Sequence, residues 1–294
     1  MSGEEAVVMA VRIVTDSASD IPQTTAAEWN IKVLPLKIRF GEEEYLDGVT
    51  ITPYEFYEKM EKADGLPKTS LIPPFEYEAV FEDAVNAGDE VVCLCISSGV
   101  SGAYQSACVA ASDYQDHVHV IDTKQFCISE YIIVERAVQL RDEGLSAAEI
   151  AKILRKELKE AHVVAVFDTL EYLRKGGRIS KTAAIAGTLL SIKPVLTITD
   201  GVVDVRAKVR GMGKGRILMA GEVEKLGGID FERPVCFAYS GTSDAMMKRY
   251  IDETHEMYRG QEAKLKTVVA GAAIGTYAGP GAIAIAFFDR NGKS

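Results

Sequence analysis

The chain of 294 residues has few of the side chains that build metal and redox sites. It contains five cysteines and four histidines, and no two cysteines are spaced as CxxC. Cys93 and Cys95 lie two apart in a predicted strand, so we expect both on one face as reduced thiols of the core. His117 and His119 flank a strand and form no ligand set. The sequence predicts neither a metal site nor a redox pair.

Basic residues are also in deficit. The chain has 33 lysines and arginines against 43 aspartates and glutamates, which gives a net charge of −10. This balance argues against a broad nucleic-acid-binding face and against docking on anionic lipid, whereas a basic partner remains compatible with it. Residues 1–9 carry Glu4 and Glu5 and no basic region, so we expect no signal peptide and a cytoplasmic location.

Long hydrophobic runs are scarce as well. Residues 268–288 carry no charge and are long enough to span a bilayer, but glycines and Pro280 interrupt them. We expect a strand, a glycine turn and a second strand there, and therefore no integral membrane protein.

The common catalytic motifs are missing. There is no Walker A sequence, and the loop at 211–215 lacks a Ser or Thr after its lysine. No GxGxxG follows the first predicted strand, which disfavours a dinucleotide site. The segment 97–99 is no GxSxG elbow and has no evident histidine partner, which disfavours a serine hydrolase. We expect no catalytic residue.

The pattern that is present alternates strands and helices. Predicted strands at 11–14, 91–96 and 118–121 alternate with helices at 76–87 and 129–143, which indicates a parallel sheet with helices on both faces. Ligands of such sheets gather beyond the carboxyl ends of the strands. The residue pairs expected at that edge are Asp16-Ser17, Ser97-Ser98 and Asp122-Thr123.

A second unit follows. Ser146 and Glu149 are spaced as a capping box for a helix at 146–160, which leads out of a first domain at 1–160. A second domain at 161–294 begins with a strand, and Asp200-Gly201 indicates a hairpin, so its sheet is mixed. The expected fold class is α/β, with an N-terminal parallel α/β/α domain and a C-terminal mixed-sheet α/β domain.

Two hydroxyl-rich loops are the candidate binding site. Residues 97–107 read SSGVSGAYQSA after a buried strand, and residues 67–70 read PKTS. Hydroxyls with free backbone N–H groups and little charge favour a guest with one mild negative charge, such as a carboxylate. Ser98 fits a plain helix cap as well as a ligand contact, and both roles are compatible.

Basic residues form two clusters, for which solvated surface is the ordinary explanation. In the first, Gly176-Gly177 indicates a helix C-cap or a close backbone approach, and Arg178 is a candidate interface residue. The clusters are Arg174, Lys175, Arg178 and Lys181, and Arg206, Lys208, Arg210, Lys214 and Arg216.

Taken together, seven ordered segments resemble the DegV family, bacterial fatty-acid-binding proteins that serve as acyl carriers for fatty acid kinase. They extend over most of the chain, and the ordered set is far more specific than any one of them. The segments are TDSASDIP at 15–22, KTS at 68–70, SSGVSGAYQSA at 97–107, LEYLRKGGRIS at 170–180, SIKPVL at 191–196, KVRG at 208–211 and IGTYAGPG at 274–281.

The resemblance implies a non-catalytic carrier that holds one long-chain fatty acid, without metal or cofactor, and presents its carboxylate to a partner kinase. Family contacts to the carboxylate fall on Thr69 and Ser98, with Ser70 and Ser97 adjacent. Tyr277 stands where the family often has a histidine, and tyrosine donates a hydrogen bond without positive charge. The candidate docking residues are Arg178, Arg206 and Arg210.

Two other functions stay open. The second domain of the family is similar to part of dihydroxyacetone kinase, so a small-molecule enzyme is one alternative, although the histidine and the Asp-rich metal loops of that chemistry are not evident. A lipid-responsive regulator is the other, and it would need a DNA-binding partner.

Overall fold

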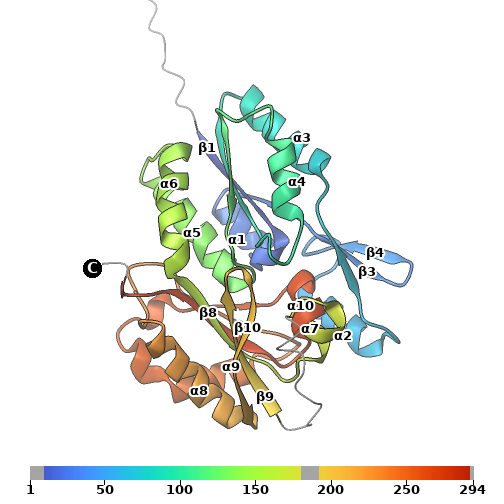
Figure 1. Cartoon of the computed structure of the whole chain (residues 1–294), viewed down its shortest axis with the longest axis vertical. Coiled ribbons are helices and arrows are strands. Elements are labelled where there is room, and N and C mark those ends of the chain that lie inside the picture. Colours follow the sequence, from blue (N-terminus) through green and yellow to red (C-terminus); the bar gives the residue numbers. More distant parts are fainter. Residues whose placement is uncertain (1–9, 180–191, 292–294) are drawn as a thin grey trace, which may run out of the picture.

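The computed structural model describes residues 10–179 and 192–291, so residues 1–9 and Lys181 of the sequence analysis lie outside the described residues. Its first sheet is parallel throughout, in the order β2-β1-β6-β7 (Figure 1). The strands are β1 (Val11–Asp16), β2 (Lys32–Leu34), β6 (Glu90–Cys95) and β7 (Val118–Asp122).

Helices cover both faces of this sheet, as the alternating sequence predicted. On β6, Val92 and Leu94 pack towards α5 and α6, whereas Cys93 and Cys95 pack towards α3 and α4. Both cysteines are buried free thiols on one face, with their sulfurs 3.7 Å apart. The helices of this part are α1 (Gln23–Glu28), α3 (Pro74–Asn86), α4 (Ala103–Ala110), α5 (Ile128–Asp142) and α6 (Ala147–Glu157).

The second sheet is mixed, in the order β10-β9-β8-β13-β11-β12, with β11 and β12 parallel and the other pairs antiparallel. The predicted hairpin is present, and Asp200 and Gly201 take the positive φ angles of 51° and 81° that such a turn requires. The strands are β8 (Ala161–Val166), β9 (Ile192–Thr199), β10 (Val202–Arg210), β11 (Cys236–Tyr239), β12 (Lys266–Val269) and β13 (Ile283–Phe288).

Helix α5 lies between the two sheets and packs on both of them (Figure 1). Ten of its residues are buried, which explains why it shows no amphipathic pattern. The outer face of the second sheet is covered by α8 (Met212–Lys225) and α9 (Ala245–Glu253). The chain is therefore α/β with a parallel and a mixed sheet, as expected, while the domain boundary at 160/161 stays a prediction.

A small antiparallel sheet, β4-β3-β5, lies beside these layers, and α10 packs against it, α2 and α7. Its strands are β3 (Lys37–Phe40), β4 (Glu43–Leu46) and β5 (Lys68–Ser70), and the helices are α2 (Pro53–Lys62), α7 (Glu171–Gly176) and α10 (Ala272–Ala278). Short 3₁₀ turns are η1 (Ser17–Ser19), η2 (Leu158–Glu160), η4 (His255–Tyr258) and η5 (Glu262–Lys264).

Helix α10 corrects one expectation. Residues 268–288 were expected to be two strands joined by a glycine turn, yet a helix lies between β12 and β13. Its first N–H groups, on Ala272 and Ala273, donate to the carboxylate of Asp47 at 2.8 and 3.1 Å. Asp20 accepts from the N–H of Gly271 at 2.8 Å. These caps come from more than 200 residues away, so no local pattern announces the helix.

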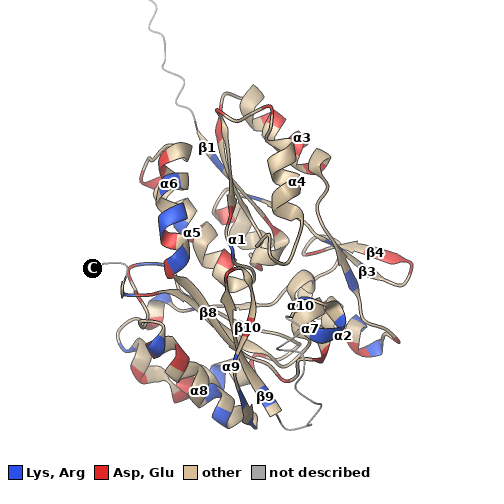
Figure 2. Ribbon diagram, viewed as in Figure 1, with Lys and Arg blue, Asp and Glu red and all other residues tan. Residues whose placement is uncertain are grey.

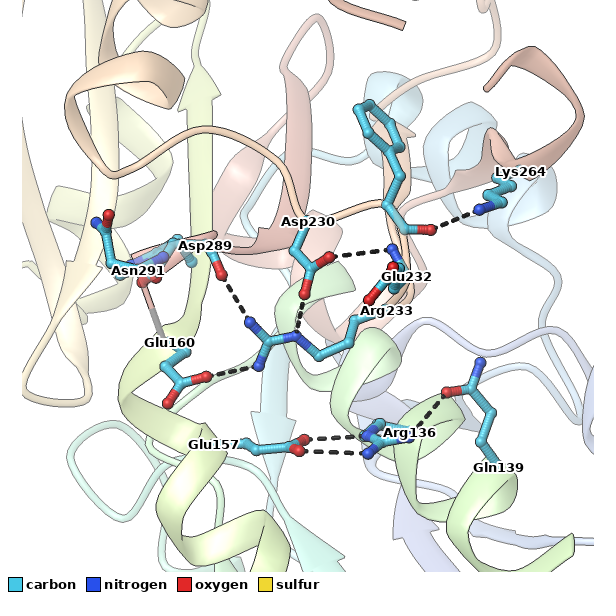
Figure 3. A network of polar contacts seen from close by, with 12 residues as sticks. Arg136, Gln139, Glu157, Glu160, Asp230, Glu232, Arg233, Lys264, Asp289 and Asn291 are labelled. Atoms are coloured by element: carbon cyan, nitrogen blue, oxygen red, sulfur yellow. Dashed lines mark hydrogen bonds and ion pairs between the residues drawn. The ribbon is translucent and has the colours of Figure 1, made fainter. Parts of the chain in front are cut away.

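Two arginines hold η2 and the end of α6 in place (Figure 3). Arg136 on α5 binds Glu157 at the end of α6, at 3.1 and 3.3 Å. Arg233 donates to Glu160 at 2.6 Å, to Asp230 at 2.9 Å and to the carbonyl of Asp289 at 2.6 Å. Because the Arg233 side chain is only 9% exposed, this network is a rigid link between η2 and the residue that follows β13. Within the described residues, no helix has the length and apolar character needed to cross a membrane.

Candidate functional site

A cavity of about 390 Å³ lies where the three sheets meet. Its walls come from β5 and the following residues, from the loop after β6, and from α7, α10 and β10. Most of the lining is apolar, and three of the polar side chains, Thr69, Tyr277 and Arg178, lie together. The polar lining residues are Thr69, Ser70, Ser101, Arg178 and Tyr277, and the apolar ones include Leu36, Leu71, Ile96, Phe126, Phe167, Leu173, Val203 and Ile274.

Hydroxyls from distant parts of the chain meet at the polar side. The Oγ1 of Thr69 on β5 lies 2.6 Å from the hydroxyl of Tyr277 on α10. Either hydroxyl can be the donor of this bond, so the hydrogen of the other one is available for a ligand oxygen. The guanidinium carbon of Arg178 lies 5.1 Å from the centre of the Tyr277 ring. Arg178 therefore supplies a positive charge beside the hydroxyl pair.

Gly176 and Gly177 place Arg178 beside Tyr277. One glycine allows a close backbone approach and the other forms the helix C-cap, the two roles that the sequence suggested. Gly177 ends α7 in the left-handed conformation at φ 70°, with its N–H bonded to the carbonyl of Arg174. A Cβ at Gly176 would collide with the ring of Tyr277, so this glycine lets α7 and α10 approach closely. Arg178 then donates to the carbonyls of Gly176 at 2.9 Å and Val100 at 3.4 Å.

A smaller cavity of about 70 Å³ continues inward between α5, α10 and the second sheet. Its few hydroxyls are engaged: Thr197 donates to the carbonyl of Val163, Ser240 donates to that of Gly279, and the hydroxyl of Tyr239 pairs with that of Tyr54. The lining is otherwise apolar. Five residues line both cavities, so they adjoin directly: Phe126, Phe167, Val203, Ile274 and Ala278.

The loop after β6 differs from the expected helix cap. Helix α4 begins at Ala103, and Gly102 stands at its N-cap, so Ser98 does not cap it. Ser98 donates its hydroxyl to Asp122 and receives a bond from the Nζ of Lys124 at 2.8 Å. Buried Ser97 donates to the carbonyl of Gly201 at 2.8 Å. Neither serine is among the residues that line the cavity.

The free amides expected after Ser98 are not free. The N–H of Ser98 donates to Asp122, that of Gly99 donates to the hydroxyl of Ser97, and those of Val100 and Ser101 donate to the Ser97 carbonyl. The loop satisfies its own donors and presents Ser101 and Gly102 to the cavity instead. Strand-end residues do meet at this edge, since Asp16 accepts from the N–H of Ile96 at 2.8 Å.

Buried carboxyls lie behind the cavity without lining it. Burial raises the pKa of Asp16 to about 7 and that of Asp20 to about 8, and it also raises the pKa of Asp47 and of Glu130. Backbone N–H donors oppose this rise only in part. Asp20 and Asp47 cap α10, so these groups hold the helix that carries Tyr277.

The other predicted arginines lie away from the cavity. Arg206 on β10 lies 3.5 Å from both Asp204 and Glu222, and Arg210 is exposed at the end of that strand. Across the described residues there is no group of three or more His, Cys, Asp or Glu side chains arranged to hold a metal ion.

Comparison with known proteins identifies the family to which this chain belongs. A model of the family described as "uncharacterised protein, DegV family" matches residues 10–290. The chain belongs to the DegV family. It is 36% identical over 285 residues to a DegV domain-containing protein of Caldanaerobacter subterraneus, covering 95% of this chain and 99% of that protein. The resemblance read from the ordered motifs is thereby confirmed.

Solved DegV structures share the fold over nearly the whole chain. A Thermus thermophilus DegV protein described by its fatty acid binding superposes with a TM-score of 0.85 at 31% identity, covering 95% of this chain and all of that one. A stearic-acid-binding protein of Eubacterium ventriosum gives 0.82 at 30% identity, with coverages of 93% and 96%. DegV of Bacillus subtilis, a fatty acid binding protein, gives 0.79 at 29% identity, with coverages of 95% and 98%.

Sequence reasoning missed the lining role of two polar residues of this DegV chain, Arg178 and Ser101. Arg178 was expected at an interface, and the structure places it in the cavity wall beside Tyr277. The signal was present, because a glycine pair before an arginine indicates a close backbone approach. Ser101 was passed over in favour of Ser97 and Ser98, and only the turn geometry distinguishes these serines.

Proposed function

We propose that this protein binds one long-chain fatty acid, with the carboxylate at the hydroxyl cluster and the acyl chain in the two adjoining cavities. One observation carries the proposal: two adjoining, mostly apolar cavities, the larger of which holds the Thr69–Tyr277 hydroxyl pair with Arg178 beside it. Solved relatives at 29 to 31% identity are described as fatty acid binding, which supports it.

The energetics favour such a guest. Burying a methylene is worth about 0.8 kcal/mol, so about 14 methylenes give on the order of 11 kcal/mol before the costs of association. A carboxylate buried without donors would offset much of this gain. Thr69, Ser70 and Tyr277 provide hydroxyl donors, and Arg178 provides the counter-charge that a histidine often supplies in the family.

The serines of the loop after β6 take a supporting role in this proposal. Ser97 ties the loop to the β9–β10 hairpin, and Ser98 ties it to Asp122 and Lys124. The loop in turn presents Ser101 to the carboxylate. Direct contact between Ser98 and the ligand stays a prediction, and it would require Ser98 to leave Asp122.

We further propose that the protein is a carrier in the cytoplasm rather than an enzyme. It would present the carboxylate to a separate fatty acid kinase for conversion to an acyl phosphate, with Arg178, Arg206 and Arg210 as docking residues. Arg206 and Arg210 are exposed on β10, and Arg178 is exposed beside the cavity, so all three are accessible to a partner.

Two assays test these steps separately. A delipidated preparation should bind a fluorescent fatty acid with one site per chain, and unlabelled stearic acid should displace it. Mixing the loaded protein with ATP, hydroxylamine and a bacterial fatty acid kinase should yield acyl hydroxamate, whereas omitting the kinase should yield none. Turnover of ATP with small ketoses by the protein alone would favour the dihydroxyacetone-kinase-like alternative.

A further inference from the structure

A second hollow, of about 810 Å³, lies between the end of α6, η2 and the β9–β10 hairpin. Its size is within the range of small-molecule sites, about 300–1,000 Å³. Three elements contribute cations to it: the loop after β7, the α6–η2 segment, and β10. The cationic lining residues, named here the basic hollow, are Lys124, Arg155, Lys156, Lys159 and Arg206. Figure 2 shows blue segments at the end of α6 that faces β8.

The carboxylates that neighbour these cations in sequence are engaged elsewhere (Figure 3). Glu157 binds Arg136 at 3.1 Å, and Glu160 binds Arg233 at 2.6 Å. In residues 10–179 and 192–291, no ion pair joins Arg155, Lys156 or Lys159 to a carboxylate of the chain. Arg155 donates to the carbonyl of Val120 at 3.4 Å, whereas Lys156 and Lys159 are exposed and line the hollow.

The two remaining cations are held in place. The Nζ of Lys124 lies 2.7 Å from Asp122 and 2.8 Å from the hydroxyl of Ser98. Arg206 is braced by Asp204 and Glu222. Arg155, Lys156 and Lys159 have no carboxylate partner among the described residues, so placing them beside these two paired cations costs self-repulsion. A bound polyanion would remove that cost and gain charge-assisted hydrogen bonds.

The floor of the hollow is not purely ionic. Leu158, Ile198 and Leu226 line it together with Thr197 and Thr199. An inorganic anion would leave these apolar side chains without a partner, whereas an organic group attached to phosphate would cover them. The acidic lining residues are Glu160, which is paired with Arg233, and Asp200, which lies at the hairpin turn.

We propose that the basic hollow binds a phosphorylated organic molecule with at least two negative charges, of the nucleotide or sugar-phosphate class. The phosphates lie against Lys124, Lys156, Lys159 and Arg206, and the organic part lies on Leu158 and Leu226. The basic hollow shares no lining residue with the larger cavity proposed for the carboxylate, but it shares Thr197 and Ile198 with the smaller cavity proposed for the acyl chain. The proposed phosphate contacts lie on other residues, so binding of the phosphorylated molecule is measured apart from fatty acid binding.

Isothermal titration of the full chain with ADP, ribose 5-phosphate, pyrophosphate and adenosine tests the proposal. At least one of the two organic phosphates should bind saturably at one site and more tightly than pyrophosphate, and adenosine should not bind. If ADP binds more tightly than ribose 5-phosphate, the ligand belongs to the nucleotide class. The opposite order assigns it to the sugar-phosphate class. Raising NaCl from about 0.02 to about 0.5 M should weaken binding, because the contacts are ionic and exposed.

The matched variants carry the same change in net charge. Lys156→Glu/Lys159→Glu should weaken binding by about tenfold or more. Lys208→Glu/Lys214→Glu should leave it nearly unchanged, since these exposed lysines lie outside the hollow. Thermal denaturation and fatty acid binding should be alike in both variants, which separates loss of the site from misfolding.

Three results would overturn the proposal: no saturable binding of either organic phosphate at low salt, equal losses in the two double variants, or binding of pyrophosphate at least as tight as that of both organic phosphates. Binding of an acidic peptide such as oligoglutamate without binding of the phosphates would identify the hollow as a protein-docking surface instead, and would also contradict the proposal.

Discussion

The hydroxyls of Thr69 and Tyr277 lie 2.6 Å apart although 208 residues separate them in the chain. Thr69 lies at the end of the small sheet, and Tyr277 lies on the helix that follows β12. The intact pair keeps one hydroxyl hydrogen for a carboxylate that enters there, and it donates two only if the carboxylate replaces the bond between Thr69 and Tyr277. The donor set exists only in the folded chain.

Tyr277→Phe removes one of these donors and keeps the ring that packs on Gly176 and below Arg178. A hydrogen bond to a charged group is worth about 1.5–3 kcal/mol, so we expect fatty acid affinity to fall by about tenfold or more. Competition with a fluorescent fatty acid measures the change.

Tyr45→Phe is the matched control. The hydroxyl of Tyr45 donates to Glu43 at 3.0 Å, and Tyr45 lines neither of the two adjoining cavities. It should leave affinity within about twofold of the parent, since the lost hydrogen bond is remote from the carboxylate. Equal losses in the two variants would mean that Tyr277 acts through packing rather than through its hydroxyl.

Arg178→Met keeps an apolar stem against Tyr277 and removes the charge. We expect weaker fatty acid binding and, above all, a weaker dependence of affinity on salt, because a counter-charge at an exposed site is screened. Arg174→Met, on exposed α7 outside the lining, is the control. An unchanged salt dependence in Arg178→Met would remove Arg178 from the proposed carboxylate site.

The sequence predicted those structural features correctly that depend only on residues close together in the chain. The Ser146–Glu149 capping box and the Asp200-Gly201 hairpin need only neighbouring residues, and the structure confirms both. The sequence did not predict features that depend on a contact with a residue far away in the chain. Helix α10 depends on Asp47, and the lining role of Arg178 depends on the packing of α7 against α10.

The choice among the serines at 97–101 illustrates the same limit. All three hydroxyls sit in one hydroxyl-rich segment, and composition treats them alike. The structure separates them because Asp122 and the Gly201 carbonyl engage the first two, while Ser101 lines the cavity. Neither acceptor could be assigned before the strands β6 and β7 and the hairpin were placed side by side.

Asp47→Ala tests the long-range cap. It would leave the first N–H groups of α10 and the hydroxyl of Ser17 without their acceptor, so we expect a loss of about 1–3 kcal/mol in the free energy of unfolding and weaker fatty acid binding. Asp83→Ala removes an exposed carboxylate paired with Arg12 and should cost little. Denaturant unfolding compares the two, and equal costs would refute the capping role.

The buried carboxyl of Asp20 predicts a pH dependence of stability. Its pKa in the folded protein, about 8, lies above its ordinary value, so the folded state holds a proton that the unfolded state loses. This proton stabilises the fold fully at acid pH, and its contribution falls as pH rises towards about 8, with a slope of at most about 1.4 kcal/mol per pH unit.

Asp20→Asn should flatten that slope between pH 5 and 8 while keeping the acceptor for the Gly271 N–H. Denaturant unfolding at several pH values measures it. A slope as steep in Asp20→Asn as in the parent would show that Asp20 is ionised in the folded protein.

The central claim is that hydrocarbon occupies the two adjoining cavities with its acid group at Thr69 and Tyr277. Mass spectrometry of organic extracts from the purified protein tests it most directly. The account predicts long-chain fatty acid at close to one molecule per chain, and much less in a Thr69→Val/Tyr277→Phe double variant. Extracts free of fatty acid from several expression hosts, together with no uptake by the delipidated protein, would contradict it.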